Sequence, residues 1–418
     1  MARTLDVYLG RHLTGHLIQD EHGQMVFDYA EDWLSSPNAV ALSHSLPLRK
    51  ERYTRDECRG YFSGILPEGD SRGTVAKNLG ISASNDFAML ERIGGECAGA
   101  VTFIPAGESL PERDDRYRHL THHELADILR RLPRRPLLAG EDGVRLSLAG
   151  AQDKIAVHLS SDQIAIPLGG APSTHILKPD NEHFAGMIFN EAFCMRLART
   201  VGLRAAQVEL GEADGVAFLL VERYDREETQ SRSGGESHLE RLHQEDFCQA
   251  LGIVSEHKYQ NEGGPSLKQC FDLVREVSSV PVIDLQFLLN GLIFNFLIGN
   301  NDAHGKNFSL LYRGETRQDL ETRLAPFYDL LSTAYYPDLA KTMAMKIGGE
   351  YSSAKVYQRH FERLAEEAGL GKALVKQRVQ EIAKELLLAI PQAQLEHLVT
   401  LNVGALVKER CEQTLSNF

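Results

Sequence analysis

The feature that most limits the possible folds of this chain is a change in hydrophobic periodicity near residue 241. Before that point, short apolar runs have the alternation that is typical of β-strands, and after it apolar residues recur at helical spacing. One helix, expected over 187–201, interrupts the strand-rich part. The pattern predicts an α+β protein in which an all-helical part follows a strand-rich part.

The expected elements divide the chain into three domains. Strands over 5–9, 12–19 and 24–29 precede several helices, so residues 1–110 are predicted to form a small α+β domain that ends in a linker rich in Gly, Pro and charges. Residues 140–240 are predicted to form a second domain, with strands over 144–148, 154–159, 163–167 and 174–178 and a hairpin over 205–223. Residues 241–418 form the third, with helices expected over 245–251, 267–277, 284–298, 353–368 and 372–388.

Composition excludes several classes of protein. The formal net charge of −13 argues against a surface that binds nucleic acid throughout, because phosphates are repelled. The most apolar stretch, 285–298, is interrupted by Asn290, Gly291 and Asn295, so no transmembrane helix and no membrane partner are expected. The start lacks the apolar segment of a signal peptide. The six cysteines are scattered, without a Cys-x-x-Cys pair, which favours reduced thiols in a cytoplasm.

The strongest local signal for chemistry is the segment 299–307, which reads Gly-Asn-Asn-Asp-Ala-His-Gly-Lys-Asn. It lies between an apolar helix and an apolar strand expected over 308–312. Asp302 and Asn307 have the Asp-x-x-x-x-Asn spacing of a kinase catalytic loop. Such an aspartate accepts a hydroxyl proton, and the asparagine oxygen holds Mg²⁺. The alternative is an ordinary turn, because Asn, Asp and Gly favour turns.

Four further features fit a phosphoryl-transfer site when they are taken together. The small-residue turn 149–152 can point backbone N–H groups at an anion, although an ordinary β-turn has the same composition. Lys178 ends an apolar strand, where a lysine can also simply reach into water. Glu191 borders a buried helix stripe, so it has Lys178, Arg196 or Arg199 as candidate partners. Asp329 is flanked by apolar residues, and a hard cation is a suitable partner for it.

With these motifs, the chain resembles the HipA family, the serine/threonine kinase toxins of bacterial type II toxin–antitoxin modules. The resemblance rests on segments spread over nearly the whole length: 64–69, 147–154, 174–179, 190–191, 222–226, 244–249, 301–307 and 328–332. Two departures leave nucleotide affinity open. Asp153 stands where a glutamate is common, and Ala303 and Gly305 exchange the usual order of small residues.

The resemblance implies a two-lobed protein-kinase-like fold with an extra amino-terminal domain. It implies that Asp302 is the catalytic aspartate, that Asn307 and Asp329 hold Mg²⁺, and that Lys178 reaches the phosphates of ATP. The turn over 149–154 cradles those phosphates, and the hinge backbone at 222–224 meets adenine. The residues it assigns to nucleotide binding are Ala149, Gly150, Ala151, Gln152, Asp153, Lys154, Lys178, Glu222, Arg223, Tyr224, His304, Lys306, Asn307, Tyr328 and Asp329.

The resemblance also implies a biological role. Ser147 matches the serine that such kinases autophosphorylate, which silences them, and a phosphate there adds about −1.5 to −2 charge just before the phosphate-binding turn. Family members phosphorylate translation components, aminoacyl-tRNA synthetases in the known cases, and cause growth arrest and persistence. They are neutralised by a helix-turn-helix antitoxin, HipB, that binds operator DNA with the toxin.

Two other functions stay open from the residues. The first is a kinase-shaped co-repressor that holds an antitoxin on operator DNA without essential catalysis. The second is a kinase of small molecules or lipids on a similar fold, although the chain has no basic amphipathic stretch for a membrane surface.

Overall fold

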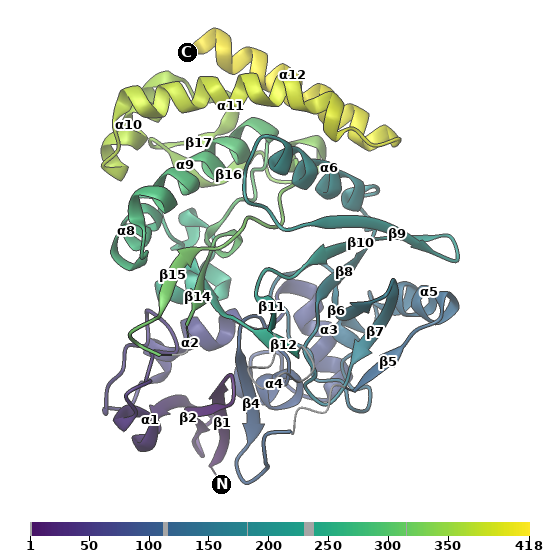
Figure 1. Cartoon of the computed structure of the whole chain (residues 1–418), viewed down its shortest axis with the longest axis vertical. Helices are drawn as coiled ribbons and strands as arrows, with labels where there is room; N and C mark the ends of the chain where they lie inside the picture. Colours follow the sequence, from purple (N-terminus) through teal and green to yellow (C-terminus); the bar gives the residue numbers. More distant parts are fainter. Residues whose placement is uncertain (1, 112–115, 182, 230–237, 315) are drawn as a thin grey trace. The chain divides into compact units, whose positions relative to one another are not determined.

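The computed structural model describes residues 2–111, 116–181, 183–229, 238–314 and 316–418, which form two compact units. We call them the amino-terminal and the carboxyl-terminal unit, and Figure 1 labels their helices and strands. The amino-terminal unit consists of Met1–Pro179, Gly211–Glu256 and Leu311–Glu321. The carboxyl-terminal unit consists of Asp180–Leu210, His257–Leu310 and Thr322–Phe418. Each unit is therefore built from three separate stretches of the chain.

Two sheets form the framework of the amino-terminal unit. The first is antiparallel with the order β3-β2-β1-β4, from β1 (Arg3–Leu9), β2 (His12–Gln19), β3 (Met25–Tyr29) and β4 (Val101–Pro105). The second has the order β5-β7-β6-β8-β10-β9, from β5 (Tyr117–His119), β6 (Ile155–Ser160), β7 (Gln163–Pro167), β8 (His175–Pro179), β9 (Val208–Ala213) and β10 (Val216–Glu222). The strands predicted over 5–9, 12–19, 24–29, 154–159, 163–167 and 174–178 are confirmed.

Helices cover these sheets and contribute to a shared core. They are α1 (Glu31–Ser35), α2 (Arg55–Gly64), α3 (Gly69–Leu79), α4 (Asp86–Ile93), α5 (His122–Arg131) and α7 (Phe247–Ala250), and β11 (Arg226–Thr229) pairs with β12 (His238–Arg241). Buried side chains of both sheets belong to one cluster, for example Leu5 and Phe27 of the first and Ile155 and Leu177 of the second. The division at residues 110, 140 and 241 into three domains stays a prediction.

One expected strand of this unit is absent from the structure. Residues 144–148 have no strand, and the segment makes only isolated bridges, from Leu146 to Glu96 and, beyond it, from Gly150 to Pro67. The apolar residues Val144, Leu146 and Leu148 are nevertheless buried. The predicted strand is wrong because the alternation of apolar residues comes from packing of an irregular segment and not from pairing in a sheet.

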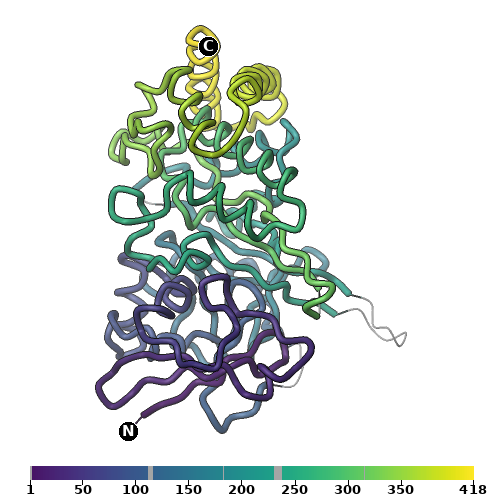
Figure 2. Tube along the Cα trace, turned by 90° about the vertical axis from the view of Figure 1, so that its left-hand side faces the viewer, coloured from purple at the N-terminus to yellow at the C-terminus, as the bar shows by residue number. Residues whose placement is uncertain are grey.

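The carboxyl-terminal unit is mostly helical. Its helices are α6 (Met187–Thr200), α8 (Leu267–Val277), α9 (Pro281–Ile298), α10 (Gln358–Ala368), α11 (Lys372–Ala393) and α12 (Leu398–Asn417). The last two pack against each other, as the yellow-green and yellow segments of Figure 2 show. Helix α12 was not predicted.

The prediction of an all-helical part after residue 241 is wrong in one respect, because short strands occur there. They are β13 (His243–Asp246), β14 (Ser309–Arg313) and β15 (Glu321–Leu324), which form one sheet, and β16 (Thr342–Ile347) and β17 (Glu350–Ser352), which form another. The helix expected over 245–251 accordingly begins as a strand. Among these strands, β14 agrees with the strand expected over 308–312, whereas the other four were not predicted.

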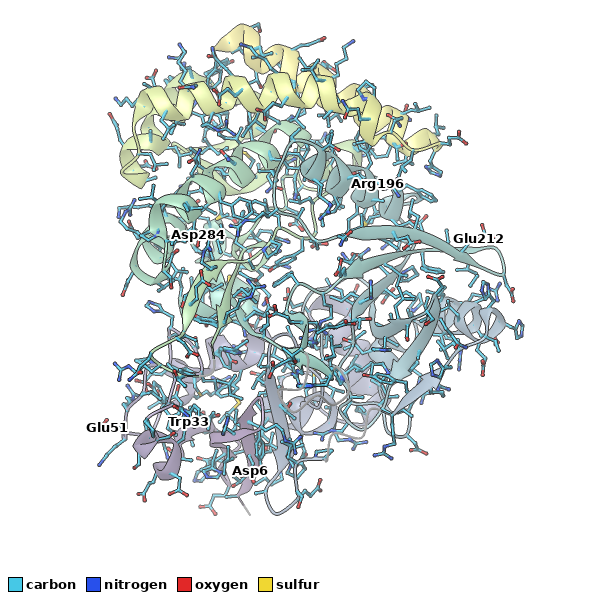
Figure 3. The ribbon with its side chains drawn as sticks, viewed as in Figure 1. Asp6, Trp33, Glu51, Arg196, Glu212 and Asp284 are labelled. Carbon is cyan, nitrogen blue, oxygen red and sulfur yellow. The ribbon has the colours of Figure 1, made fainter. Side chains whose placement is uncertain are left out.

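Helix α9 is the apolar centre of the carboxyl-terminal unit. By length and composition it could cross a membrane, with a mean hydropathy of 1.6, but 67% of it is buried inside the protein. The residues expected to interrupt it instead pack within it, since Asn295 Nδ2 donates to the Gly291 carbonyl at 2.9 Å. Near its start the buried Asp284, labelled in Figure 3, pairs with Arg323 at 3.1 Å. The helix is therefore a core helix held by polar contacts at both ends.

Candidate active site

The predicted phosphate turn is anchored to a segment of the amino-terminal domain. Gly150 has a φ of +100°, which favours glycine, and forms a parallel bridge with Pro67. The Glu68 N–H donates to the Gly150 carbonyl at 3.1 Å, and Lys154 Nζ donates to the Ala149 carbonyl at 2.9 Å. A Cβ at position 150 would lie only 2.6 Å from Lys154 Nζ. The backbone conformation therefore favours glycine here, and a larger residue would also displace the end of the Lys154 side chain.

Ser147 lies just before this turn and is completely buried. Its Oγ donates to the Ile65 carbonyl at 3.0 Å, and its backbone N–H donates to the Glu96 carbonyl at 2.9 Å. A phosphate on this oxygen would have no room in the described conformation, and it would remove the hydroxyl donor that binds Ile65. Modification of Ser147 therefore requires the segment before the turn to leave its place.

Lys178 on β8 is more deeply buried than Asp153, which lies within the turn. Lys178 lies on β8, in register with Leu219 of β10, and is only 5% exposed. A buried ammonium is costly unless it has polar partners. Asp153 is half-buried within the turn, and burial raises the pKa of its carboxyl, although Lys154 lowers it. Lys178 is thus a buried cation on a rigid strand of the same sheet as β6, which follows the turn.

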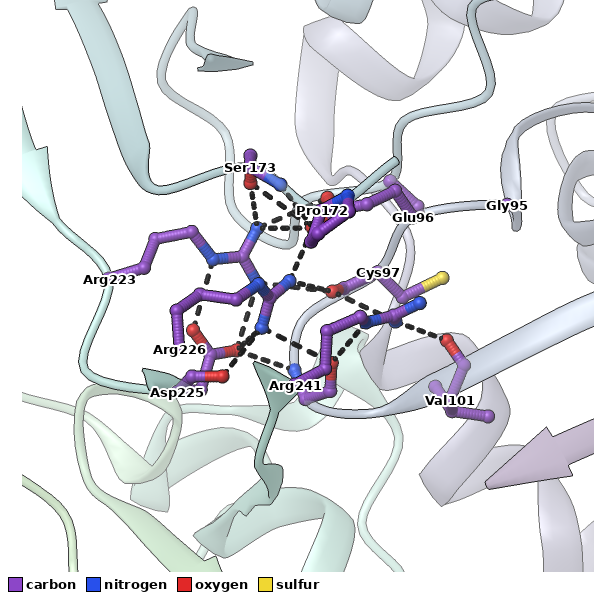
Figure 4. A network of polar contacts seen from close by, with 12 residues as sticks. Gly95, Glu96, Cys97, Val101, Pro172, Ser173, Arg223, Asp225, Arg226 and Arg241 are labelled. Atoms are coloured by element: carbon purple, nitrogen blue, oxygen red, sulfur yellow. Dashed lines mark hydrogen bonds and ion pairs between the residues drawn. The ribbon is translucent and has the colours of Figure 1, made fainter. Parts of the chain in front are cut away.

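Among the predicted hinge residues 222–224, Arg223 lies in a buried network of charges (Figure 4). Arg223 pairs with Glu96 at 3.2 Å and with Asp225 at 2.9 Å, and Arg226 pairs with both carboxylates. Burial by itself raises the pKa of Asp225, but the two arginines outweigh burial and hold that pKa well below its ordinary value.

The contacts of residues 222–224 within the protein limit which of their groups could bind a nucleotide. The Arg223 side chain is committed to carboxylates within the protein, and its N–H donates to the Thr174 carbonyl at 2.9 Å. Tyr224 contacts Gln244 through its hydroxyl, while Glu222 is exposed at the end of β10. Any contribution of Arg223 to a nucleotide site therefore comes from its carbonyl, and its guanidinium has a structural role.

The predicted catalytic loop begins where α9 ends. Gly299 ends the helix with a φ of +74°, and Asn300 Nδ2 donates to Asn295 Oδ1 at 2.8 Å. The Asp302 N–H donates to Asn300 Oδ1 at 3.1 Å. The Asn301 N–H donates to Thr333 Oγ1 at 2.7 Å. These bonds fix the backbone that leads into Asp302, while its own side chain stays exposed.

Asn307 and Asp329 lie next to each other, as a shared metal site requires. Asn307 Nδ2 donates to Asp329 Oδ2 at 3.2 Å, and Asn307 Oδ1 accepts from the His304 N–H at 3.1 Å. Asp329 has a φ of +58°, an unusual backbone conformation of the kind that clusters at functional sites. An amide and a carboxylate oxygen are suitable ligands for Mg²⁺.

Two side-chain ligands, from Asn307 and Asp329, are enough for a metal ion that takes its other ligands from a substrate and from water. The described residues contain no group of three His, Cys, Asp or Glu side chains that could hold an ion by themselves. Mg²⁺ is commonly held by one or two side chains together with phosphate oxygens and water. The pair Asn307 and Asp329 thus fits a metal brought in with a nucleotide.

Among the other three residues assigned to this site, Tyr328 makes contacts that hold the loop in shape. The Tyr328 hydroxyl donates to the Lys306 carbonyl at 2.7 Å and lies 2.7 Å from Ser309 Oγ. His304 and Lys306 are buried. After Asp329, the buried Asn190 of α6 bonds both backbone groups of Ser332, at 2.9 and 3.0 Å. The loop and the segment of Asp329 are therefore connected by side chains of several elements.

The predicted site residues fall into two groups. Residues 147, 149–154, 178 and 222–224 belong to the amino-terminal unit, and residues 302, 304, 306, 307, 328 and 329 belong to the carboxyl-terminal unit. Lys178 and Glu191 are in different units, so their pairing stays a prediction. Sequence reasoning missed Glu96 and Asn190 as supports of these segments. Asn190 lies in one of the family-like segments, but no pattern in the sequence assigns a role to Glu96.

Two family models match the chain. The HipA N-terminal domain matches residues 5–104, and the HipA-like C-terminal domain matches residues 146–393. A protein of Sinorhizobium fredii that is named as a kinase, Y4mE, is 46% identical over 91% of this chain and 89% of its own length. The serine/threonine-protein kinase toxin HipA of Shewanella oneidensis is 31% identical over 95% of this chain and 90% of its own length.

A solved structure agrees with these sequence matches. It is the complex of HipA, HipB and operator DNA from the toxin–antitoxin system of Shewanella oneidensis MR-1, and its matching chain has 28% sequence identity. The TM-score is 0.84, with 99% of this chain and 97% of that chain covered. The fold is a mixed α and β fold of the kinase-like class.

The fold and the matches to the family models and the named kinases define an enzyme of the protein-kinase class. The chain belongs to the HipA family of serine/threonine-protein kinase toxins. The resemblance noticed in the sequence and the enzyme class that it implied are confirmed.

Proposed function

We propose that this protein transfers the γ-phosphoryl group of ATP to a serine or threonine of a protein, as the toxin of a toxin–antitoxin module. The observation that carries the proposal is the loop Asn301–Asn307, in which an exposed aspartate precedes an asparagine bonded to Asp329. The remaining support is the phosphate turn over 149–154 and the buried Lys178 in a chain of the HipA family.

In the proposed reaction each residue has a separate task. The turn 149–154 and Lys178 bind the phosphates, and the hinge backbone at 222–224 binds adenine. Asn307 and Asp329 hold Mg²⁺, which when bound offsets the negative charge of the phosphates. Asp302 accepts the proton of the serine or threonine hydroxyl. The oxygen of that hydroxyl forms a bond to the γ-phosphorus, and the bond from the γ-phosphorus to the oxygen between the β- and γ-phosphates breaks, which releases ADP.

The direct test is incorporation of label from ATP in the presence of Mg²⁺, with the chain itself as acceptor. Asp302→Asn is expected to lower the rate by at least about 100-fold, because positioned proton transfer typically contributes that much or more. The matched control is Asp338→Asn, which makes the same change at an exposed position of the same unit. Equal incorporation by wild type and Asp302→Asn rejects the assignment.

We also propose that self-inactivation occurs at Ser147. Its support is the family resemblance together with the bond from Ser147 to Ile65, which a phosphate would break. The same labelled product, analysed by mass spectrometry, should carry its phosphate on Ser147. Phosphate found only at other residues overturns this site.

The partners follow from the relatives. We propose a HipB-like helix-turn-helix antitoxin, because the solved relative is a complex of HipA with HipB and operator DNA, and contact with operator DNA mainly through that antitoxin. The proposed substrate is a translation component such as an aminoacyl-tRNA synthetase, in a cytoplasm that keeps the six buried cysteines as thiols. Phosphoproteomics after induction of wild type and of Asp302→Asn tests the substrate.

The rival function is a co-repressor that needs no catalysis, and it has specific support in the operator DNA of the solved relative. The two functions predict different effects of the Asp302→Asn variant on cell growth. If Asp302→Asn arrests growth on overexpression as fully as wild type does, the co-repressor becomes the better reading.

A further inference from the structure

A tyrosine outside the catalytic loop contacts the aspartate of that loop. The Tyr259 hydroxyl donates a hydrogen bond to Asp302 Oδ1 at 2.8 Å. The two residues are 43 positions apart in the sequence and belong to the same unit. None of the motifs that identify the loop includes Tyr259, so the contact is a product of the fold.

The backbone and neighbours of Tyr259 hold its ring in place. Its carbonyl accepts hydrogen bonds from the N–H groups of Glu262 and Gly264 at 2.9 and 2.8 Å, which close a turn. The ring meets the buried ring of His304 edge-on, with 5.4 Å between centroids. The next side chain, Gln260, accepts a bond from the Lys346 N–H at 2.8 Å. A fixed segment therefore presents the phenol to Asp302.

Asp302 keeps capacity for a second hydroxyl. An ionised carboxylate has two oxygens with about four acceptor sites, and Tyr259 uses one of them on Oδ1. The Asp302 side chain is exposed, so a hydroxyl from outside can reach it. Its backbone is held by Asn300 and by a bond from the His304 N–H to the Asp302 carbonyl at 2.8 Å. The hydrogen bond from the phenol restrains rotation of the Asp302 side chain.

We propose that Tyr259 is a positioning residue that holds the Asp302 carboxylate with its second oxygen turned to the acceptor hydroxyl. The inference rests on the proposed function, in which Asp302 is the base. A hydrogen bond from a phenol to an ionised carboxylate is stronger than one between neutral groups, so it can hold the carboxylate in one orientation. Restraint of a reacting group in one orientation accelerates a step without tighter binding of the nucleotide.

The test removes the hydroxyl and keeps the ring. Tyr259→Phe leaves the edge contact with His304 and the turn intact, so the thermal midpoint and the apparent KM for ATP are expected to stay at wild-type values. The initial rate of self-phosphorylation at saturating ATP and Mg²⁺ is expected to fall about 10- to 100-fold. The matched control is Tyr351→Phe, which removes the same atom from a tyrosine of β17 in the same unit and should change none of the three quantities.

The other outcomes separate the positioning role from its alternatives. A rate equal to that of wild type overturns the proposal, and a higher rate overturns it in favour of a phenol that blocks the acceptor. A parallel fall in thermal midpoint and a rise in KM for ATP also overturn it, because they indicate a merely structural residue. Asp302→Asn is measured beside it: if that variant stays active, the proposed function fails, whereas an inactive Asp302→Asn with a normal Tyr259→Phe removes only the positioning role.

Discussion

The pKa of a buried charged side chain in this protein depends on hydrogen-bond partners that lie far away in the sequence. Glu245 on β13 is completely buried and accepts hydrogen bonds from the His44 N–H at 2.9 Å and from the hydroxyls of Ser43 and Tyr312. Burial raises the pKa of its carboxyl to about 7, although these hydrogen bonds lower it. The residue therefore titrates near neutral pH, and its protonation is coupled to stability.

Replacing Glu245 by Gln is expected to remove one component of the pH dependence of stability. The folded-state pKa of about 7 lies above the ordinary value of 4.5, so the folded state binds the proton more tightly. This contribution is complete below about pH 4.5 and is lost as pH rises through 7. Between pH 5.5 and 8 the free energy of unfolding of wild type, relative to Glu245→Gln, should fall by about 2 kcal/mol. Denaturant titrations across this range measure it, and a difference that does not vary with pH contradicts the assignment.

Among the elements of the carboxyl-terminal unit, α9 has the most influence on the candidate site, because the predicted catalytic loop begins where this helix ends. Its interior glycine, Gly291, faces the ring of Phe327, which stands two residues before Asp329. A Cβ at position 291 would lie 2.0 Å from Phe327 Cζ, closer than any real contact. Glycine at position 291 therefore allows the helix to pack closely against the Phe327 ring, although glycine in a helix lowers its stability.

Gly291→Ala is expected to destabilise the protein by about 1 to 3 kcal/mol, because an added methyl group forces the helix or the ring to move. Gly73→Ala is the matched control, since Gly73 is also within a helix, α3, and an added Cβ meets nothing within 4 Å. The control should be stabilising by up to about 1 kcal/mol. Chemical unfolding of both variants measures the difference, and equal effects at the two positions would contradict the packing argument.

At the scale of the whole molecule, the proposed function requires that Lys178 of one unit and Asp329 of the other both take part in binding ATP and Mg²⁺. A ligand present at about 100 times its Kd stabilises a folded protein by about 2.7 kcal/mol. Lys178→Gln in one unit and Asp329→Asn in the other should each remove most of the stabilisation by ATP and Mg²⁺. Thermal shifts with and without the nucleotide measure this, and Lys341→Gln, an exposed lysine, serves as the control.

The double variant distinguishes one shared site from two separate sites. If both residues contact the same nucleotide, the double variant loses less stabilisation than the sum of the two single losses. Losses that add up fully would indicate independent sites and would remove the basis of the proposed function.

Much of the fold and of the candidate site could be read from the chain. The loop with Asp302 and Asn307 was predictable because its residues are neighbours in sequence, and the strands β6, β7 and β8 because alternation is a local property. Among the strands after residue 241, β14 agrees with the strand expected over 308–312, whereas β13, β15, β16 and β17 were missed, since β-propensity depends strongly on the pairing partners.

The order of residues along the chain was enough to reveal the family and the kinase-like class and to predict a phosphate turn and a catalytic loop, because each motif consists of residues a few positions apart. Contacts between distant residues required folding. They include the burial of Ser147 against Ile65, the commitment of Arg223 to Glu96, and the hydroxyl of Tyr259 on Asp302. Hydrogen bonds and ion pairs act over a few ångströms in space, and only the packed chain determines which side chains come that close.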